Sequence, residues 1–261
     1  MKNKILITLP NKDIINDLKK LGITNFVYPL DNFCVGIPNS FSFSEIDCDG
    51  YIYINRILDN SGIDELKSIK EDILTNKHIK GVIFDDLGVL QVFKDTHLET
   101  ILYMTHFMCS SKEVNEYLEF VDSVILSTDI TVNEIKYIID NAKKSISLFT
   151  FGLVSTMYSR RLLLDNYSKF YNLDKVNPLT INNTNNSFIL YENNYGTVLY
   201  HDHYLYDKNL LDLNVLYYFY HPIFLSNEEI LNVLSNNFDN IKTDTGFLYK
   251  ETIFKLKSGD E

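Results

Sequence analysis

The chain has 261 residues and a formal net charge of −11, and 45% of its residues are hydrophobic and 23% charged. This composition is ordinary for a globular protein. A domain that binds nucleic acid through the phosphates is expected to be basic or to carry a basic stripe, and the sequence has no long run of Lys or Arg. The charge therefore argues against autonomous nucleic-acid binding, although not against binding together with a basic partner.

The cysteines and the first residues indicate where the protein works. Cys34, Cys48 and Cys109 form no CxxC pair, and three cysteines cannot all pair with one another. We expect a reduced cytoplasmic protein, and we expect these thiols to make a poor metal or iron–sulfur site. The apolar run near the N-terminus is too short for a signal peptide and reads as a first core strand. No stretch approaches 18 apolar residues, so no membrane span is expected.

Short apolar runs alternate with helical patterns from the first residues onward. The expected strands are Lys4–Leu9, Asn25–Tyr28, Tyr51–Asn55, Gly81–Phe84, Thr100–Met104, Asp122–Leu126, Ser145–Phe151 and, near the end, Asn214–Tyr220. The expected helices are Asn11–Leu21, Ile63–Asn76, Leu87–Phe93, Ser111–Phe120, Thr131–Asp140 and Ser226–Leu234. The last two begin with Thr131 and Ser226, each followed three residues later by Glu, which is the pattern of a capping box.

Repeated strand–helix steps with short loops predict an α/β fold with a parallel sheet. No GxGxxG or Walker loop follows the first strand, which favours a single (β/α)8 TIM-like barrel over residues 1–261. We expect the barrel to be irregular after its second strand, because no helical pattern lies between Tyr28 and Tyr51. After the seventh strand, Phe188–Glu192 and Thr197–Tyr200 flank NNYG and predict a β-hairpin, within an insertion at about 181–203. The tail 255–261 is expected to fray.

The C-terminal ends of barrel strands point into one mouth, so the polar residues there are candidates for chemistry. Asp85 and Asp86 follow an apolar strand, and one of them can accept a substrate hydroxyl or bind a cation; the alternative is that one caps the next helix. His106 follows another strand and is either a general acid or base or a hydrogen-bonded structural imidazole. His221 also falls at a strand end, whereas His201 and His203 share one face of the hairpin, which we expect to be solvated.

The stretch LFTFGLVSTMYSRRLLLDNY, residues 148–167, reads as a buried strand that breaks into a turn at Gly152. Arg160 and Arg161 follow, and adjacent arginines can bind a carboxylate or phosphate through paired hydrogen bonds. The alternative is a structural salt bridge to Asp165 or Glu192. We therefore predict a ligand-binding set at the mouth, and the residues assigned to it are Arg160, Arg161, Asn55, Tyr158 and Tyr167.

Four segments resemble those of peptidase family U32, the collagenase-like proteins. GVIFDDLGVLQVF at 81–93 resembles the family's strand–Asp–LGVL motif, and SVILSTDITVNEIKYI at 123–138 is similar to its strand followed by an EI helix. LFTFGLVSTMYSRRLLLDNY resembles the family signature, in which a glycine ends a strand and a YS-basic-basic run follows. FILYENNYGTVLY at 188–200 is similar to a downstream hairpin. The resemblance implies catalytic or orienting roles for Asp85, Asp86 and His106.

The departures from the family pattern shape the functional expectation. Many members carry a histidine before the signature glycine and cysteines that bind an iron–sulfur cluster, whereas this chain has Phe151 and Ser155, and no cysteine follows Cys109. The resemblance implies a cluster-free bacterial subunit in tRNA wobble-uridine 5-hydroxylation, with prephenate as co-substrate, a longer cysteine-bearing paralogue as partner and tRNA bound through the complex. The alternatives are a peptidase and a non-catalytic scaffold for the paralogue, which would carry an exposed apolar patch.

Overall fold

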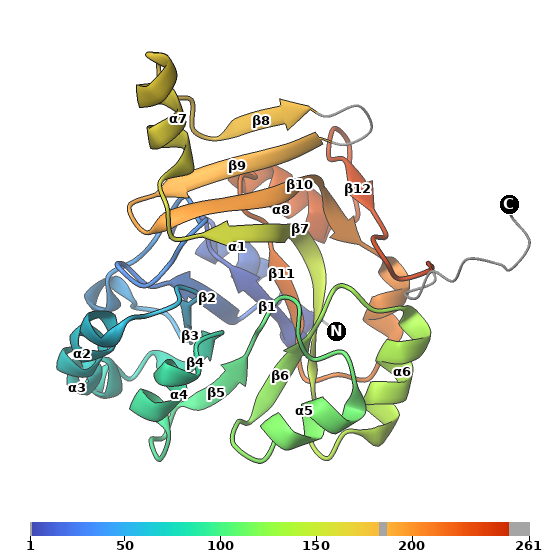
Figure 1. Cartoon of the computed structure of the whole chain (residues 1–261). Coiled ribbons are helices and arrows are strands. Elements are labelled where there is room, and N and C mark those ends of the chain that lie inside the picture. Colours follow the sequence, from blue (N-terminus) through green and yellow to red (C-terminus); the bar gives the residue numbers. More distant parts are fainter. Residues whose placement is uncertain (1, 183–186, 251–261) are drawn as a thin grey trace, which may run out of the picture.

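The computed structural model describes residues 2–182 and 187–250 (Figure 1). Eight parallel strands form a closed ring, as the sequence predicted. They are β1 (Ile5–Thr8), β2 (Asn25–Pro29), β3 (Gly50–Ile54), β4 (Ile79–Phe84), β5 (Glu99–Leu102), β6 (Ser123–Leu126), the first part of β7 (Ser147–Ser159) and β11 (Tyr218–His221). Strand β11 pairs with both β1 and β7, which closes the barrel.

Helices lie outside the ring and link its strands (Figure 1). They are α1 (Ile15–Lys20), α2 (Asn60–Ser68), α3 (Lys70–Thr75), α4 (Leu87–Phe93), α5 (Ser111–Tyr117), α6 (Val132–Asn141) and α8 (Asn227–Leu234). Three short 3-10 turns are also present: η1 (Lys2–Lys4), η2 (Phe43–Glu45) and η3 (Lys208–Asp212). Two capping boxes form as predicted, with Thr131 at the start of α6 and Ser226 at the start of α8. Among the described residues no helix has the length and apolar character needed to cross a membrane.

The connection between β2 and β3 is irregular, as the sequence predicted. Its 3-10 turn η2 replaces a crossover helix, and Leu30 forms an isolated bridge with Phe41. The single helix predicted over 63–76 is two helices instead, because the chain leaves helical geometry at Ile69, where φ is −101° and ψ is 2°.

Strand β7 corrects one prediction. It does not end at Gly152 but continues to Ser159. Gly152 has a φ of +153°, and a Cβ there would lie 2.6 Å from the carbonyl oxygen of His221, so glycine lets the strand pass close to β11. Beyond this point β7 leaves the ring and pairs antiparallel with β10.

The second half of β7 begins a sheet that extends outside the ring. Its order is β7, β10 (Gly196–Tyr206), β9 (Ser187–Asn193) and β8 (Leu179–Asn182), and the short strand β12 (Thr243–Asp244) pairs with β10. Strands β9 and β10 form the predicted hairpin, although it is longer than expected. Helix α7 (Leu163–Tyr171), which the sequence did not predict, joins β7 to this extension. The expected frayed tail lies outside the described residues.

The core fills the ring and the space beneath the helices. The strands of the ring are buried along almost their whole length, and their residues belong to one continuous apolar cluster. Phe149 and Phe219 pack against Tyr103 in the barrel interior, with ring centroids 5.6 to 6.0 Å apart. This packed interior leaves room for polar chemistry only toward the mouth.

Candidate active site at the barrel mouth

A small cavity of 70 Å³ opens at the C-terminal ends of the ring strands. Strands β3, β4, β5, β7 and β11 supply one side of it, and the connection after β2 and strand β10 supply the other. The lining residues are Val35, Tyr53, Asn55, Asp85, Tyr103, Thr105, Leu153, Ser155, Tyr158, Val198, Tyr200 and His221. The barrel topology therefore brings Asp85, Asn55 and Tyr158, three of the residues predicted from the sequence, to one site.

Asp85 carries an unusual carboxyl group at the end of β4. Its Oδ1 atom is buried and has no hydrogen-bond partner among the described residues. Burial, and to a smaller extent the charge of neighbouring Asp86, raise the pKa of Asp85 from its ordinary value of 3.8 to about 8. The side chain is therefore largely protonated at neutral pH and can donate a hydrogen bond into the cavity.

Asp86 has a structural position instead. Its Oδ1 accepts a hydrogen bond of 2.7 Å from the amide of Gly88 and caps α4, and its Oδ2 accepts one of 2.7 Å from the amide of Leu58. The alternative in which one of the two carboxylates caps the next helix is therefore confirmed for Asp86. Asp86 ties α4 to the segment before α2 and leaves Asp85 to face the mouth.

His221 ends β11 and is 5% exposed. Its Nδ1 lies 2.8 Å from Oγ1 of buried Thr8, and its ring packs edge-on against Tyr53. Burial lowers the pKa of His221 to about 3, so the imidazole is neutral at physiological pH. The position of His221 at a strand end was predicted from the sequence, but its burial depends on β1 and β3, which are distant in the chain.

Four tyrosines line the cavity, and two of them form hydrogen bonds to the segments that lie over it. Tyr200 donates a hydrogen bond of 2.9 Å to the carbonyl of Gly36, in the connection after β2, and Tyr158 donates one of 3.5 Å to the carbonyl of Tyr195. Burial raises the pKa values of Tyr53 and Tyr103, and the charge of Asp85 adds to this effect. Their hydroxyls remain protonated and can act as donors.

Asn55 holds the same connection over the mouth. Its Oδ1 accepts from the amide of Val35 at 2.8 Å, and its Nδ2 donates to the carbonyl of Val35 at 3.0 Å. The side chain of Asn55 therefore satisfies both backbone groups of Val35, as a neighbouring strand would. Asn55 lines the cavity, but both ends of its amide are occupied.

The sequence contains only three arginines, and all three follow strands that end near the mouth: Arg56 after β3, and Arg160 and Arg161 after β7. Arg160 Nη2 lies 3.1 Å from Asp59 Oδ2, and Arg56 stacks over Tyr195, with its guanidinium carbon 4.3 Å from the ring centroid. We call Arg56 and Arg160 the arginine rim.

Tyr158 connects the arginine rim to the cavity. Its hydroxyl donates to the carbonyl of Tyr195, the residue over which Arg56 stacks. Burial raises the pKa of Tyr158, while the charges of Arg160 and Arg56 oppose that increase. Arg56 was not among the ligand-binding residues predicted from the sequence. The rarity of arginine in a chain with 24 basic residues is the signal that could have identified it.

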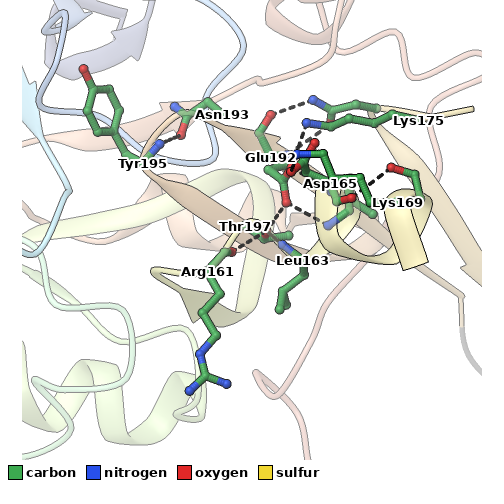
Figure 2. A network of polar contacts seen from close by, with 12 residues as sticks. Arg161, Leu163, Asp165, Lys169, Lys175, Glu192, Asn193, Tyr195 and Thr197 are labelled. Atoms are coloured by element: carbon green, nitrogen blue, oxygen red, sulfur yellow. Dashed lines mark hydrogen bonds and ion pairs between the residues drawn. The ribbon is translucent and has the colours of Figure 1, made fainter. Parts of the chain in front are cut away.

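The sequence also predicted, as an alternative, a salt bridge between one of the two arginines after β7 and Asp165 or Glu192. A salt bridge does form, but with a different partner. Arg160 pairs with Asp59, and Glu192 pairs with Lys175 at 2.7 Å. The side chain of Arg161 points away from the Glu192 network, while its carbonyl accepts a hydrogen bond of 2.9 Å from Thr197 (Figure 2).

Glu192 organises the chain that follows the arginines (Figure 2). Its carboxylate accepts hydrogen bonds from the amides of Leu164 and Asp165, at 2.7 and 3.1 Å, and from Thr197 Oγ1 at 2.7 Å. Burial raises the pKa of Glu192, but Lys175, Thr197 and the two amides outweigh it and hold the pKa below its ordinary value. The ionised carboxylate thereby caps the first turn of α7.

Two predicted site residues lie away from the cavity. His106 is exposed, and its Nδ1 lies 2.8 Å from Asp129 Oδ2. Tyr167 is on the outer side of α7, where its ring contacts Tyr171. His201 and His203 stack on each other and line a second cavity of 320 Å³ beside Asp129, so the hairpin face expected to be solvated is partly enclosed.

The three cysteines lie in separate environments. Cys34 is buried and donates to the carbonyl of Tyr53 at 2.9 Å, and burial raises its pKa to about 12. Cys48 is partly buried beside Lys19, and Cys109 is exposed. Within residues 2–182 and 187–250, no group of three or more His, Cys, Asp or Glu side chains is placed to hold a metal ion.

The chain is similar to part of a known protein sequence and to two solved structures. An uncharacterized protease of Methanocaldococcus jannaschii is 29% identical over 111 residues, which are 40% of this chain and 27% of that protein. The chain therefore spans about a quarter of the length of this relative. The solved U32 peptidase Mk0906 has 12% identity and a TM-score of 0.49, covering 69% of this chain and 82% of that structure. The spore cortex-lytic enzyme SleL of Bacillus cereus has 10% identity and a TM-score of 0.41, covering 94% and 76%.

The family model described as peptidase family U32 matches residues 42–175. This match runs from the connection before β3 through β7 and α7, so it includes Asp85 and all three arginines. The resemblance seen in the sequence motifs is thereby confirmed, and the chain belongs to peptidase family U32.

Proposed function

We propose that the barrel mouth binds a small molecule with a carboxylate or phosphate group. The anionic group would contact the arginine rim, and a hydroxyl or carbonyl of the same molecule would enter the cavity. The observation that carries this proposal is the Asp85 carboxyl in the cavity, whose buried Oδ1 has no hydrogen-bond partner among the described residues. In its protonated form Asp85 donates a hydrogen bond without repelling an anionic ligand as a carboxylate would.

The size of the cavity supports a small ligand. Its 70 Å³ accommodates a few water molecules or one functional group, because a single water needs about 10–15 Å³ on this measure. The Arg160–Asp59 pair is exposed to solvent, and exposed ion pairs contribute little to stability. Arg160 can therefore exchange Asp59 for a ligand at small cost.

Within the U32 family, the reaction we propose is tRNA wobble-uridine 5-hydroxylation in the cytoplasm, in which this chain is a cluster-free subunit. Prephenate suits the site because it combines carboxylates with a hydroxyl group. A longer cysteine-bearing paralogue would supply the redox chemistry, and tRNA would bind to the complex, consistent with the acidic charge of this chain.

The peptidase alternative is less well supported by the residues at the mouth. His221 and Thr8 form a hydroxyl–imidazole pair, but an imidazole with a pKa of about 3 is a weak base at neutral pH. Thr8 is also buried, at 3% exposed. A cavity that admits one functional group does not suit a peptide with side chains on both sides of the cleaved bond.

Calorimetric titration with prephenate tests the binding step. Each hydrogen bond to a charged group contributes about 1.5–3 kcal/mol, so the double variant Arg56→Gln/Arg160→Gln is expected to bind at least about tenfold more weakly. Lys169→Gln is the matched control, since Lys169 is an exposed cation in a surface ion pair on α7. Equal affinities of the rim variant and the wild type would rule out the proposed site.

The hydroxylation step needs its own assay. The chain, its cysteine-bearing paralogue, tRNA and prephenate are combined, and 5-hydroxyuridine is measured by mass spectrometry. Loss of product in both Asp85→Asn and the rim variant, with Lys169→Gln active, is the expected result. Full activity of both mouth variants would favour the scaffold alternative, and peptide cleavage that survives the rim substitutions would favour the peptidase.

A further inference from the structure

The outer side of α7 and the chain that follows it carry an exposed apolar surface. Among the described residues, six of the 14 exposed large apolar side chains lie within 15 consecutive positions. They are Tyr167, Phe170, Tyr171, Leu173, Val176 and Ile181, which we call the α7–β8 face. Phe170 is 80% exposed. Large apolar side chains left exposed together in one short segment mark a candidate interaction site.

The α7–β8 face is held in place by the fold. Tyr171 contacts both Tyr167 and Phe170, with ring centroids 4.8 and 4.9 Å apart. Asn177 exchanges hydrogen bonds with the backbone of Glu192, at 2.6 and 3.0 Å. Together with the Lys175–Glu192 ion pair, these contacts fix the segment between α7 and β8 against β9. The exposed side chains are therefore displayed by an ordered scaffold.

Strand β8 ends the sheet β7–β10–β9–β8, and within residues 2–182 and 187–250 no strand pairs with its outer edge. Figure 1 shows α7 and β8 standing away from the ring. An open edge offers backbone N–H and C=O groups to another strand, which natural proteins cover or block. The open edge of β8 and the apolar side chains of the α7–β8 face lie in one stretch of chain. A partner that adds a strand to this edge can therefore cover both.

The charge around this face points to a second copy of the chain as the partner. Arg161, Lys169 and Lys175 balance Asp165, Asp174 and Glu192, so the surroundings are neutral although the whole chain carries −11. Two copies that meet here therefore bring together surfaces without net charge, although each whole chain is negative. Antiparallel pairing of one edge with itself also satisfies two-fold symmetry.

We propose that the protein forms a dimer through the α7–β8 face. The β8 strands pair antiparallel across a two-fold axis and join the two extensions into one sheet, and the aromatic side chains of the two α7 helices cover each other. The interface lies outside the barrel mouth.

One competing occupant is single-stranded RNA, since aromatic side chains interleaved with lysines can stack on bases. The other is the cysteine-bearing paralogue, and a wild type that stays monomeric alone but binds the paralogue through Phe170 would overturn the dimer in its favour. The structure favours protein over RNA, because Asp165, Asp174 and Glu192 balance the cations around the face and leave no net positive charge to attract phosphates. Leu173, Val176 and Ile181 offer no ring for stacking, and an open strand edge is matched by another strand.

Sedimentation velocity of the full chain at 1–100 μM tests the proposal. We expect the wild type to be a dimer. For Phe170→Glu we expect a dissociation constant at least about 100-fold higher, because the substitution places an unpaired charge in the interface. Phe120→Glu is the matched control, because Phe120 is 70% exposed in the turn after α5, outside the α7–β8 face. Ile181→Lys adds a charge beside the β8 edge and should weaken the dimer in the same way.

Circular dichroism establishes whether each variant is folded. If Phe170→Glu does not fold, Phe170→Ser takes its place in the experiment. A monomeric wild type at 100 μM overturns the proposal, and so does a dimer that Phe170→Glu and Ile181→Lys leave intact. A monomer that binds single-stranded RNA through Phe170 overturns it in favour of the RNA alternative. Titration with prephenate is independent of these outcomes, so failure of the dimer and failure of the mouth site are distinguishable.

Discussion

The closed ring and the sheet that extends from it are stabilised differently. In the ring, parallel strands of Ile, Leu, Val and aromatic residues are buried on both faces, and each strand has neighbours on both sides. In the extension, strands β8 and β9 are mostly exposed or half-buried, and a buried charged network around Glu192 fixes their connection to α7. The ring is held by apolar burial, whereas the extension depends on a few polar contacts.

The mouth lies where these two regions meet. Asp85 and His221 come from the ring, while Tyr158 and Tyr200 come from the parts of β7 and β10 that belong to the extension. Opening the extension would therefore expose the buried carboxyl and imidazole to water. The following predictions separate the contribution of each region.

The largest effect is expected from Glu192→Ala. Removing this carboxylate leaves Thr197 and the first amides of α7 without their acceptor, while Lys175 is partly exposed and becomes hydrated. Because each hydrogen bond to a charged group contributes about 1.5–3 kcal/mol, we expect a loss of about 4 kcal/mol of unfolding free energy. Hydrogen exchange should show loss of protection in α7, β8 and β9, while amides of β1 to β6 stay protected. Glu192→Gln, which retains one acceptor oxygen, should lose less. Uniform loss of protection across the ring would contradict the distinction between the two regions.

Asp85→Asn is expected to stabilise the protein in alkaline solution. The folded-state pKa of Asp85, about 8, lies above the unfolded value of 3.8, so the folded state binds more protons between these values. Wild-type stability therefore falls as pH rises from about 4 to about 8, and the neutral amide removes this loss. At one pKa unit per 1.36 kcal/mol, and allowing for partial contact with solvent, we expect a gain of about 3 kcal/mol at pH 8.

Urea unfolding of wild type and Asp85→Asn at pH 4 and pH 8 measures this gain. The two proteins should differ little at pH 4, because this pH is close to the unfolded-state pKa of 3.8 and little of the pH-dependent loss has yet accumulated. A difference that does not change with pH would mean that Asp85 titrates normally and that its burial does not govern its charge.

Local patterns predicted much of the ring. The apolar runs located its strands, and the Thr131 and Ser226 caps are properties of four consecutive residues, so sequence alone identified them. The course of β7 was missed because Gly152 resembles a strand end locally. Only the pairing of β7 with β10, about 45 residues later, shows that the strand continues.

The site was predictable to a similar degree. The position of Asp85 after a buried strand placed it at the mouth, but its difference from Asp86 depends on the Leu58 amide, which belongs to another strand–helix unit. The pairing of Arg160 with Asp59 joins residues 101 positions apart, and no local pattern indicates it. Contacts between distant segments decide which polar side chain remains free for chemistry.

His221 should give the opposite pH dependence from Asp85. Its folded-state pKa of about 3 lies below the unfolded value of 6.5, so the unfolded state binds the proton first as pH falls. The stability that neutral His221 provides is present above pH 6.5 and is lost toward pH 3. In the wild type this loss is masked between about pH 6.5 and 4, because the Asp85 carboxyl makes the folded state more stable as the pH falls over the same range.

The comparison of Asp85→Asn with Asp85→Asn/His221→Gln removes the masking. Between pH 7 and pH 5 the single variant should lose about 2 kcal/mol of unfolding free energy that the double variant retains, since glutamine does not titrate. The double variant starts from a lower stability, because it loses the ring packing with Tyr53, so the slope with pH is the quantity to compare. Equal slopes would mean that water reaches the imidazole, and hence that the extension opens readily over the mouth instead of sealing it.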